Sequence, residues 1–137
     1  MFPRILCLLL ACLLCSCGDK KTTAMLADEL ATHMETLPGI VGSVTDQQSA
    51  EAATKNIESL QSEILRINQQ VKEGKFLIRN DRLALEKRLR AVTGECEYLL
   101  QKLRGKPELL LMLTEPIADL GTALEQSRSV MKAAPAK

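Results

Sequence analysis

Apolar residues follow two different patterns along this chain of 137 residues. The first is a continuous apolar run from Ile5 to Cys15. Beyond residue 20, apolar residues recur instead at steps of three and four, which places them on one face of a helix. The chain therefore divides into a short apolar amino-terminal segment and a longer amphipathic part.

The clearest amphipathic pattern begins after Thr45. Residues Thr45 to Gln48 fit a capping box at a helix start, and Gly74 suits a helix end. The pattern predicts a helix of about 28 residues, or about 40 Å. Its apolar positions form an uninterrupted heptad seam: Ala50, Ala53, Ile57, Leu60, Ile64, Ile67 and Val71.

Two later stretches carry similar seams. The register shifts between the first seam and the next, which favours a turn within residues 73–81, although a stutter in one long helix would also produce the shift. Gly105 suits the end of one helix and Pro107 the first turn of another, while Pro116 predicts a kink or a restart. The two seams are Leu85, Leu89, Val92, Cys96, Leu99 and Leu103, then Leu113, Ile117, Leu120, Leu124 and Met131.

A shorter helix is predicted over residues 25–37, with Pro38 and Gly39 at its end. No useful length of chain alternates with the period of two that a half-buried strand requires. The sequence therefore predicts an all-α fold, an elongated antiparallel helical hairpin or bundle of three to four helices with heptad, coiled-coil-like seams. This bundle domain is expected over residues 24–132, followed by a frayed tail at 133–137. Such seams pack either within one chain or between chains.

The amino-terminal run follows Arg4 and is about 11 residues long, so as a helix it rises only about 16 Å, less than a bilayer core of about 30 Å. A short basic start before an apolar run of this length is typical of an export signal. The run leads into Leu14-Cys15-Ser16-Cys17, which resembles the lipobox of bacterial lipoproteins. An ordinary secretion signal or an uncleaved anchor is the alternative interpretation.

The resemblance implies that residues 1–16 are a signal peptide and that the Cys17 thiol carries a diacylglyceryl group after cleavage. Cys12 ends a second, overlapping match and is the less favoured lipidation residue. Two or three acyl chains, such as palmitate, make attachment effectively permanent. Residues 17–23 then form a lipidated, polar tether. In this family an Asp directly after the lipidated Cys favours retention in the inner membrane. This chain has Gly18 at that position, so the resemblance favours the periplasmic face of the outer membrane over the inner membrane or the cell surface.

Composition narrows the functions open to the exported part. The chain has no Trp, one Tyr, two Phe and one His, so aromatic platforms for bases and His-built metal sites are not expected. Motifs of the GxSxG, HExxH, P-loop and GxGxxG types are missing from the sequence. We therefore expect no catalytic residue, no metal, no cofactor besides the lipid, no nucleic-acid partner and no small-molecule substrate.

Two residues on the seams carry reactive groups. His33, with Glu29 and Glu35 as its near neighbours in the predicted helix, is interpreted as a structural residue. Cys96 is the only cysteine after Cys17, and it is interpreted as a small apolar filler. The alternative for Cys96 is a disulfide between chains, which an oxidising compartment permits.

The net charge of +1 conceals two charged blocks. Residues 24–73 hold eight acidic and three basic residues, whereas residues 75–106 hold nine basic and four acidic ones. The simplest interpretation is that neighbouring antiparallel helices neutralise one another. The alternative is a contact face for anionic lipid, acidic glycan or a partner protein, formed by Arg79, Arg82, Lys87, Arg88 and Arg90.

These features predict a membrane-anchored lipoprotein of the cell envelope, acting as a non-catalytic helical interaction or structural module. Its expected partner is another envelope protein or a second copy of itself. A lipidated Cys, heptad helices and a final Lys also resemble the murein lipoprotein, whose last Lys is joined to peptidoglycan. That resemblance implies the alternative of a peptidoglycan-linked tether through Lys137, although the chain departs from that protein in length, in its helix breaks and in the Ala-Pro-Ala before Lys137.

Overall fold

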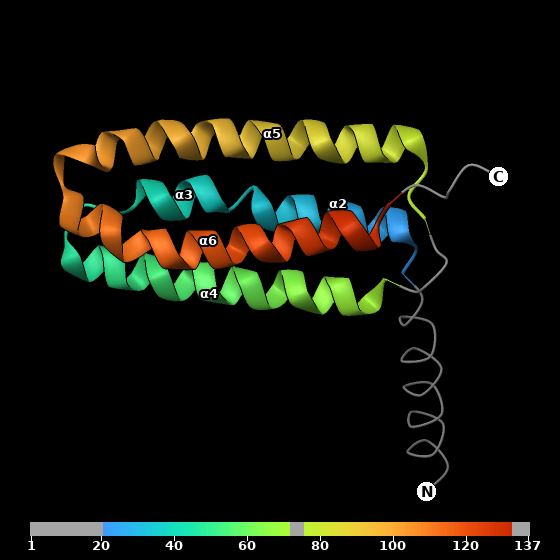
Figure 1. Ribbon diagram of the computed structural model, residues 1–137, viewed down its shortest axis with the longest axis horizontal. Helices are drawn as coiled ribbons and strands as arrows, with labels where there is room; N and C mark the ends of the chain where they lie inside the picture. The colour runs from blue at the N-terminus through green and yellow to red at the C-terminus, as the bar shows by residue number, and fades with distance from the viewer. Residues whose placement is uncertain (1–20, 72–75, 133–137) are drawn as a thin grey trace, which may run out of the picture.

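The structure is a computed structural model that describes residues 21–71 and 76–132. In these two ranges the chain forms an elongated bundle of helices and no strand (Figure 1). The predicted all-α helical bundle is therefore confirmed. Its elements are α2 (Thr23–Met34), α3 (Leu37–Gly42), α4 (Gln47–Gln70), α5 (Arg79–Lys102), the 3-10 turn η1 (Leu103–Gly105) and α6 (Pro107–Val130).

The chain reverses direction between successive long helices. In Figure 1, α2 and α3 run one way, α4 runs back, α5 returns and α6 again follows the direction of α4. Polar contacts give the same directions, because Thr54 and Asn68 of α4 reach the carbonyls of Met112 and Ala123 of α6 in that order. The shift of register between the first two seams is therefore a reversal of the chain and not a stutter.

Helix pairing follows from these directions. α4 packs along the length of α6, and α5 packs on α2 and α3. Each of these pairs runs in parallel, while α2 and α4 cross the bundle in opposite directions. From α3 onward each helix is therefore antiparallel to the next one in the chain, and the most extensive packing joins the parallel helices α4 and α6.

The predicted helix over residues 25–37 is two helices in the structure. α2 ends at Met34, and α3 begins at Leu37 with Pro38 in its first turn. The sequence predicts that Pro38 ends a helix, whereas it begins one, because a fixed φ and a missing N–H suit the first turn. Leu37, Pro38 and Val41 are buried, so α3 extends the apolar face of α2.

α4 begins with a capping box placed one residue later than predicted. Asp46 is the N-cap, and its Oδ1 accepts a hydrogen bond from the Ser49 N–H at 2.8 Å. Ser49 Oγ in turn accepts from the Asp46 N–H at 3.0 Å. The Ser49 backbone bond holds the pKa of Asp46 below its ordinary value, as expected for a carboxylate at a helix N-terminus. The prediction of Thr45 and Gln48 as the box residues is wrong.

α6 contains Pro116 but continues through it. A proline inside a helix removes one donor and leaves the carbonyl four residues earlier without its usual partner. That carbonyl belongs to Met112, and the Thr54 hydroxyl of α4 lies 3.5 Å from it. The predicted restart at Pro116 is therefore wrong, while the helix start at Pro107 is confirmed.

The predicted seams form the core within a single chain. Six of the seven positions on α4 are buried, and Val71 is half-buried. Leu99 and Ile117 of the later seams are likewise half-buried, while the other members of those seams are buried. α6 buries additional residues that the heptad pattern omits: Leu109, Pro116, Ala123 and Ser127.

Candidate functional site

Three predicted site residues lie outside the described ranges: Cys12, Cys17 and Lys137. The predicted tail at 133–137 lies outside them as well. The first described residue, Lys21, comes four positions after Cys17 in the sequence. Candidate features of the described part are therefore the basic face, the polar contacts near Lys21, the two seam residues with reactive groups, and one end of the bundle.

Of the five residues of the predicted basic face, Arg88 forms ion pairs within the chain and the other four are exposed. Arg88 donates from Nη1 to Asp28 Oδ1 and from Nε to Glu35 Oε1, both at 2.6 Å, and Nη2 lies 3.3 Å from Thr32 Oγ1. These bonds raise the pKa of Arg88, with Glu35 the largest cause. Arg88 therefore crosslinks α5 to α2, while the rest of the face is exposed: Arg79, Arg82, Lys87 and Arg90.

This crosslink corrects one detail of the charge interpretation. Acidic and basic blocks do neutralise each other at Arg88, but the two helices, α5 and α2, run in the same direction (Figure 1). A second arginine, Arg128 of α6, bonds Glu86 of the antiparallel helix α5 at 3.0 Å and also pairs with Glu125. Charge pairing between helices therefore does not depend on their relative direction.

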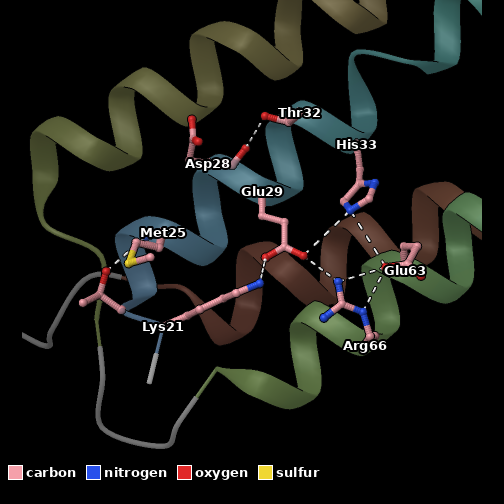
Figure 2. A network of polar contacts seen from close by, with 9 residues as sticks. Lys21, Met25, Asp28, Glu29, Thr32, His33, Glu63 and Arg66 are labelled. Atoms are coloured by element: carbon pink, nitrogen blue, oxygen red, sulfur yellow. Dashed lines mark hydrogen bonds and ion pairs between the residues drawn. The ribbon is translucent and has the colours of Figure 1, made fainter. Parts of the chain in front are cut away.

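A polar cluster joins the start of the described chain to α2 and α4 (Figure 2). Glu29 of α2 accepts from Lys21 Nζ at 2.7 Å and from Arg66 Nη2 at 2.5 Å. Arg66 Nε also donates to Glu63 Oε2 at 2.9 Å. The Lys21 hydrogen bond, followed by that of Arg66, lowers the pKa of Glu29. Lys21 is thereby fixed against the bundle.

His33 lies at the edge of this cluster (Figure 2). Its Nε2 is 3.8 Å from Glu29 Oε1 and 3.9 Å from Glu63 Oε2, distances that exceed those of hydrogen bonds. Glu63 of α4 is a neighbour that the sequence did not identify, and Glu35 instead bonds Arg88. Within the described ranges, no three His, Cys, Asp or Glu side chains are grouped to hold a metal.

Cys96 lies in the apolar core and is 7% exposed. Burial, with a smaller contribution from Glu95, raises the pKa of the Cys96 thiol to about 11. The thiol is therefore protonated at neutral pH, whereas the thiolate is the nucleophile in disulfide exchange. Its environment is that of a small apolar residue, as the seam position predicts.

One end of the bundle differs from the rest of its surface. We call it the proximal end: the end at which Lys21, the start of α2, residues 76–78, the start of α5 and the last turn of α6 lie together (Figure 1). A hollow of about 400 Å³ opens there between Lys21, Gln70 and residues 76–78. Five of the seven large apolar side chains exposed in the described ranges lie here, namely Met25, Phe76, Ile78, Leu83 and Val130.

The buried polar side-chain atoms of the described residues are satisfied within the chain. Each buried side-chain nitrogen or oxygen atom in the described part of the chain has a hydrogen-bond partner. A buried polar atom without a partner is the usual mark of a missing ligand or water. The exposed basic residues of α5 and the apolar proximal end are the surface features that the proposals below use.

The ion pairs of Glu29 and Glu35 make the fold sensitive to acid. Lys21 and Arg66 lower the pKa of Glu29, and Arg88 lowers that of Glu35, below the ordinary 4.5. The unfolded chain then binds protons more readily, so their contribution is complete above pH 4.5 and is lost as the pH falls through the folded-state pKa. We expect urea unfolding of the purified protein to show this loss as the pH falls below about 4.5, with little change above that value.

A matched pair of variants assigns the acid effect. Glu29→Gln is expected to cost about 0.2–1 kcal/mol at pH 7 and to flatten the dependence of stability on pH, because exposed or partly exposed ion pairs contribute little. Glu58→Gln is the control, since Glu58 is exposed and forms no ion pair with the described residues. A Glu29→Gln protein with the pH profile of the parent would contradict the assignment.

Residues 21–71 and 76–132 contain no helix that is both long enough and apolar enough to span a membrane. No protein-family model matches the chain, and comparison with curated proteins and with solved structures likewise gave no match.

Proposed function

We propose that the protein is a lipoprotein of the cell envelope whose helical bundle is a non-catalytic interaction or structural module. One observation carries the proposal: Leu14-Cys15-Ser16-Cys17 follows a continuous apolar run and an arginine. A basic start and an apolar stretch of this length are typical of export. Cys17 is the residue proposed to carry the diacylglyceryl anchor.

The short spacing between Cys17 and the bundle supports a role at the membrane surface. Lys21 comes four positions after Cys17, and even a fully extended chain spans only about 14 Å over four positions. Lys21 is itself bonded to Glu29 at 2.7 Å. An anchor at Cys17 would therefore hold the proximal end of the bundle close to the lipid, on the periplasmic face of the outer membrane if Gly18 has its usual effect.

The exposed residues of α5 are the surface that we propose for a protein partner. Lys87 and Arg90 lie on the exposed side of α5. The opposite side of the helix carries the buried residues Leu85, Leu89 and Val92. Arg88 does not belong to this surface, because it bonds Asp28 and Glu35 of the same chain. An acidic surface on another envelope protein would complement the remaining cations.

The test is the fate of a Cys17→Ala protein. We expect it to lose acylation, measured by palmitate labelling, and to leave the membrane fraction or remain unprocessed. Cys12→Ala is the matched control, because Cys12 lies five residues earlier in the same apolar region, and it should remain acylated at Cys17. The proposal fails if the Cys17→Ala protein is processed and fractionates with membranes like the parent.

A further inference from the structure

Residues 76–78, directly before α5, expose two apolar side chains on either side of a buried one. Leu77 is buried at 2% exposure, while its neighbours Phe76 and Ile78 are 43% and 65% exposed. Ile78 has extended backbone angles, and successive side chains of an extended segment point to opposite sides. Leu77 therefore anchors the segment in the core, so that Phe76 and Ile78 project from the proximal end.

Cations follow these apolar residues directly. Arg79 and Arg82 occupy the first turn of α5, both are exposed, and neither forms an ion pair with the described residues. Asp81 is the carboxylate of the same turn and is half-buried at the rim of the hollow. Lys132, after α6, is exposed as well. Apolar side chains flanked by cations are the combination that enters the headgroup layer of an anionic bilayer.

The opposite end of the bundle carries a smaller set of the same kind: the exposed apolar side chains Tyr98 and Leu111, with the exposed cations Lys102, Arg104 and Lys106. Two of these cations already have partners within the chain, because the Lys102 ammonium lies 4.5 Å from the centroid of the Tyr98 ring and Lys106 Nζ donates to the Thr45 carbonyl at 2.8 Å. Among the described residues, Leu111 is the most exposed large apolar side chain, at 75%, but it stands about 28 Å along α6 from Val130. It lies near the start of α6, at the other end of the bundle from the start of α2 (Figure 1). The proximal end therefore differs in two ways: it holds five of the seven exposed large apolar side chains of the described residues, and it is the end that the short tether would hold at the membrane.

We propose that the proximal end docks on an anionic bilayer, with Phe76 and Ile78 in the headgroup region and Arg79 and Arg82 against lipid phosphates. This inference rests on the proposed lipid anchor at Cys17. It adds an orientation: the bundle axis stands away from the membrane, and the exposed side of α5 at Lys87 and Arg90 faces sideways, where it is accessible to a partner.

Tryptophan reporters test the docking, because the chain has no Trp of its own. The lipidated full chain with Phe76→Trp or Ile78→Trp is reconstituted in vesicles of phosphatidylglycerol and phosphatidylcholine that carry brominated acyl chains. We expect both reporters to shift to shorter wavelength and to lose most of their emission by bromine quenching. Leu111→Trp is the matched control, and it should keep its emission.

A charge reversal separates docking from mere proximity. Arg79→Glu combined with Arg82→Glu should remove the quenching of the Phe76→Trp reporter while the protein still floats with the vesicles. Acidic residues in the first turn of a helix are compatible with folding, and circular dichroism checks this. The control pair Lys87→Glu and Arg90→Glu changes the charge equally on the side of the same helix and should leave the quenching intact.

Three results would overturn parts of this scheme, and they are distinguishable. Floating protein whose Phe76→Trp and Ile78→Trp reporters are no more quenched than Leu111→Trp rules out docking but leaves the anchor in place. Reporters that shift to shorter wavelength without bromine quenching show that a protein surface, such as a second copy, covers this end. Protein that does not float with the vesicles overturns the lipid anchor itself.

Discussion

Leu113→Ala is expected to lower the free energy of unfolding by about 2–5 kcal/mol, because truncating a fully buried leucine removes apolar contacts and leaves a cavity. Leu113 is 0% exposed. It lies on α6, which forms the most extensive helix pair of the described chain with α4. In urea unfolding followed by circular dichroism, the midpoint should fall without a large change of slope.

Leu111→Ala is the control for this experiment. Leu111 lies two residues away on the same helix, and it is 75% exposed. Both substitutions change the intrinsic helix propensity equally, so the difference between them reports burial alone. We expect the Leu111→Ala protein to differ from the parent by less than about 0.5 kcal/mol. Equal losses for the two variants would mean that α6 does not present this face to the core.

The length and regularity of the heptad seams explain why the sequence predicts the main helices well. In α4 the six seam positions from Ala50 to Ile67 are all buried, since a period near 3.6 leaves only one face for the core. The same periodicity does not state which helix covers that face. The parallel pairing of α4 with α6 therefore depends on the whole tertiary arrangement, and an antiparallel pairing fits the seams equally well.

Local signals at helix ends were ambiguous for a different reason. Thr45 and Asp46 are both good N-cap residues, and the structure selects Asp46 because Ser49, rather than Gln48, returns the second hydrogen bond. Proline likewise fits a helix start and a helix end. Pro38 begins α3 because Leu37 and Val41 beside it are buried, and that burial comes from packing rather than from the local sequence.

The candidate site was predictable in composition but not in arrangement. The basic residues of α5 are visible in the sequence, yet nothing local separates Arg88 from its neighbours. Its partners Asp28 and Glu35 lie more than 50 residues earlier. The proximal end is a similar case, because the start of α2, residues 76–78 and the last turn of α6 come together there only after the chain has reversed direction (Figure 1). Contacts between segments that are distant in the sequence depend on how the helices pack, and the spacing of residues along one helix does not predict them.

The second large effect is expected at a buried polar pair between α4 and α6. Ser127 is 0% exposed and is the one buried polar residue of the described chain. Its hydroxyl lies 2.6 Å from Asn68 Oδ1 and 3.1 Å from the Ala123 carbonyl, while Asn68 Nδ2 donates to the same carbonyl at 3.2 Å. A polar pair inside an apolar interface is satisfied in only one alignment of the helices, so it favours the parallel register of α4 and α6.

Ser127→Ala and Asn68→Ala are each expected to lower the free energy of unfolding by about 1–3 kcal/mol, since each removes the bond and Ser127→Ala also leaves Asn68 Oδ1 without its donor. The double variant should lose less than the sum of the two, with a coupling of at least about 0.5 kcal/mol, because the second substitution removes a group that already lacks its partner. Asn56→Ala is the control, because Asn56 is an exposed residue of α4, the helix that carries Asn68. Its removal should lower the free energy of unfolding by less than about 0.5 kcal/mol. Strictly additive losses at Ser127 and Asn68 would mean that the two side chains act independently, and the register of α4 and α6 would then depend on apolar packing alone.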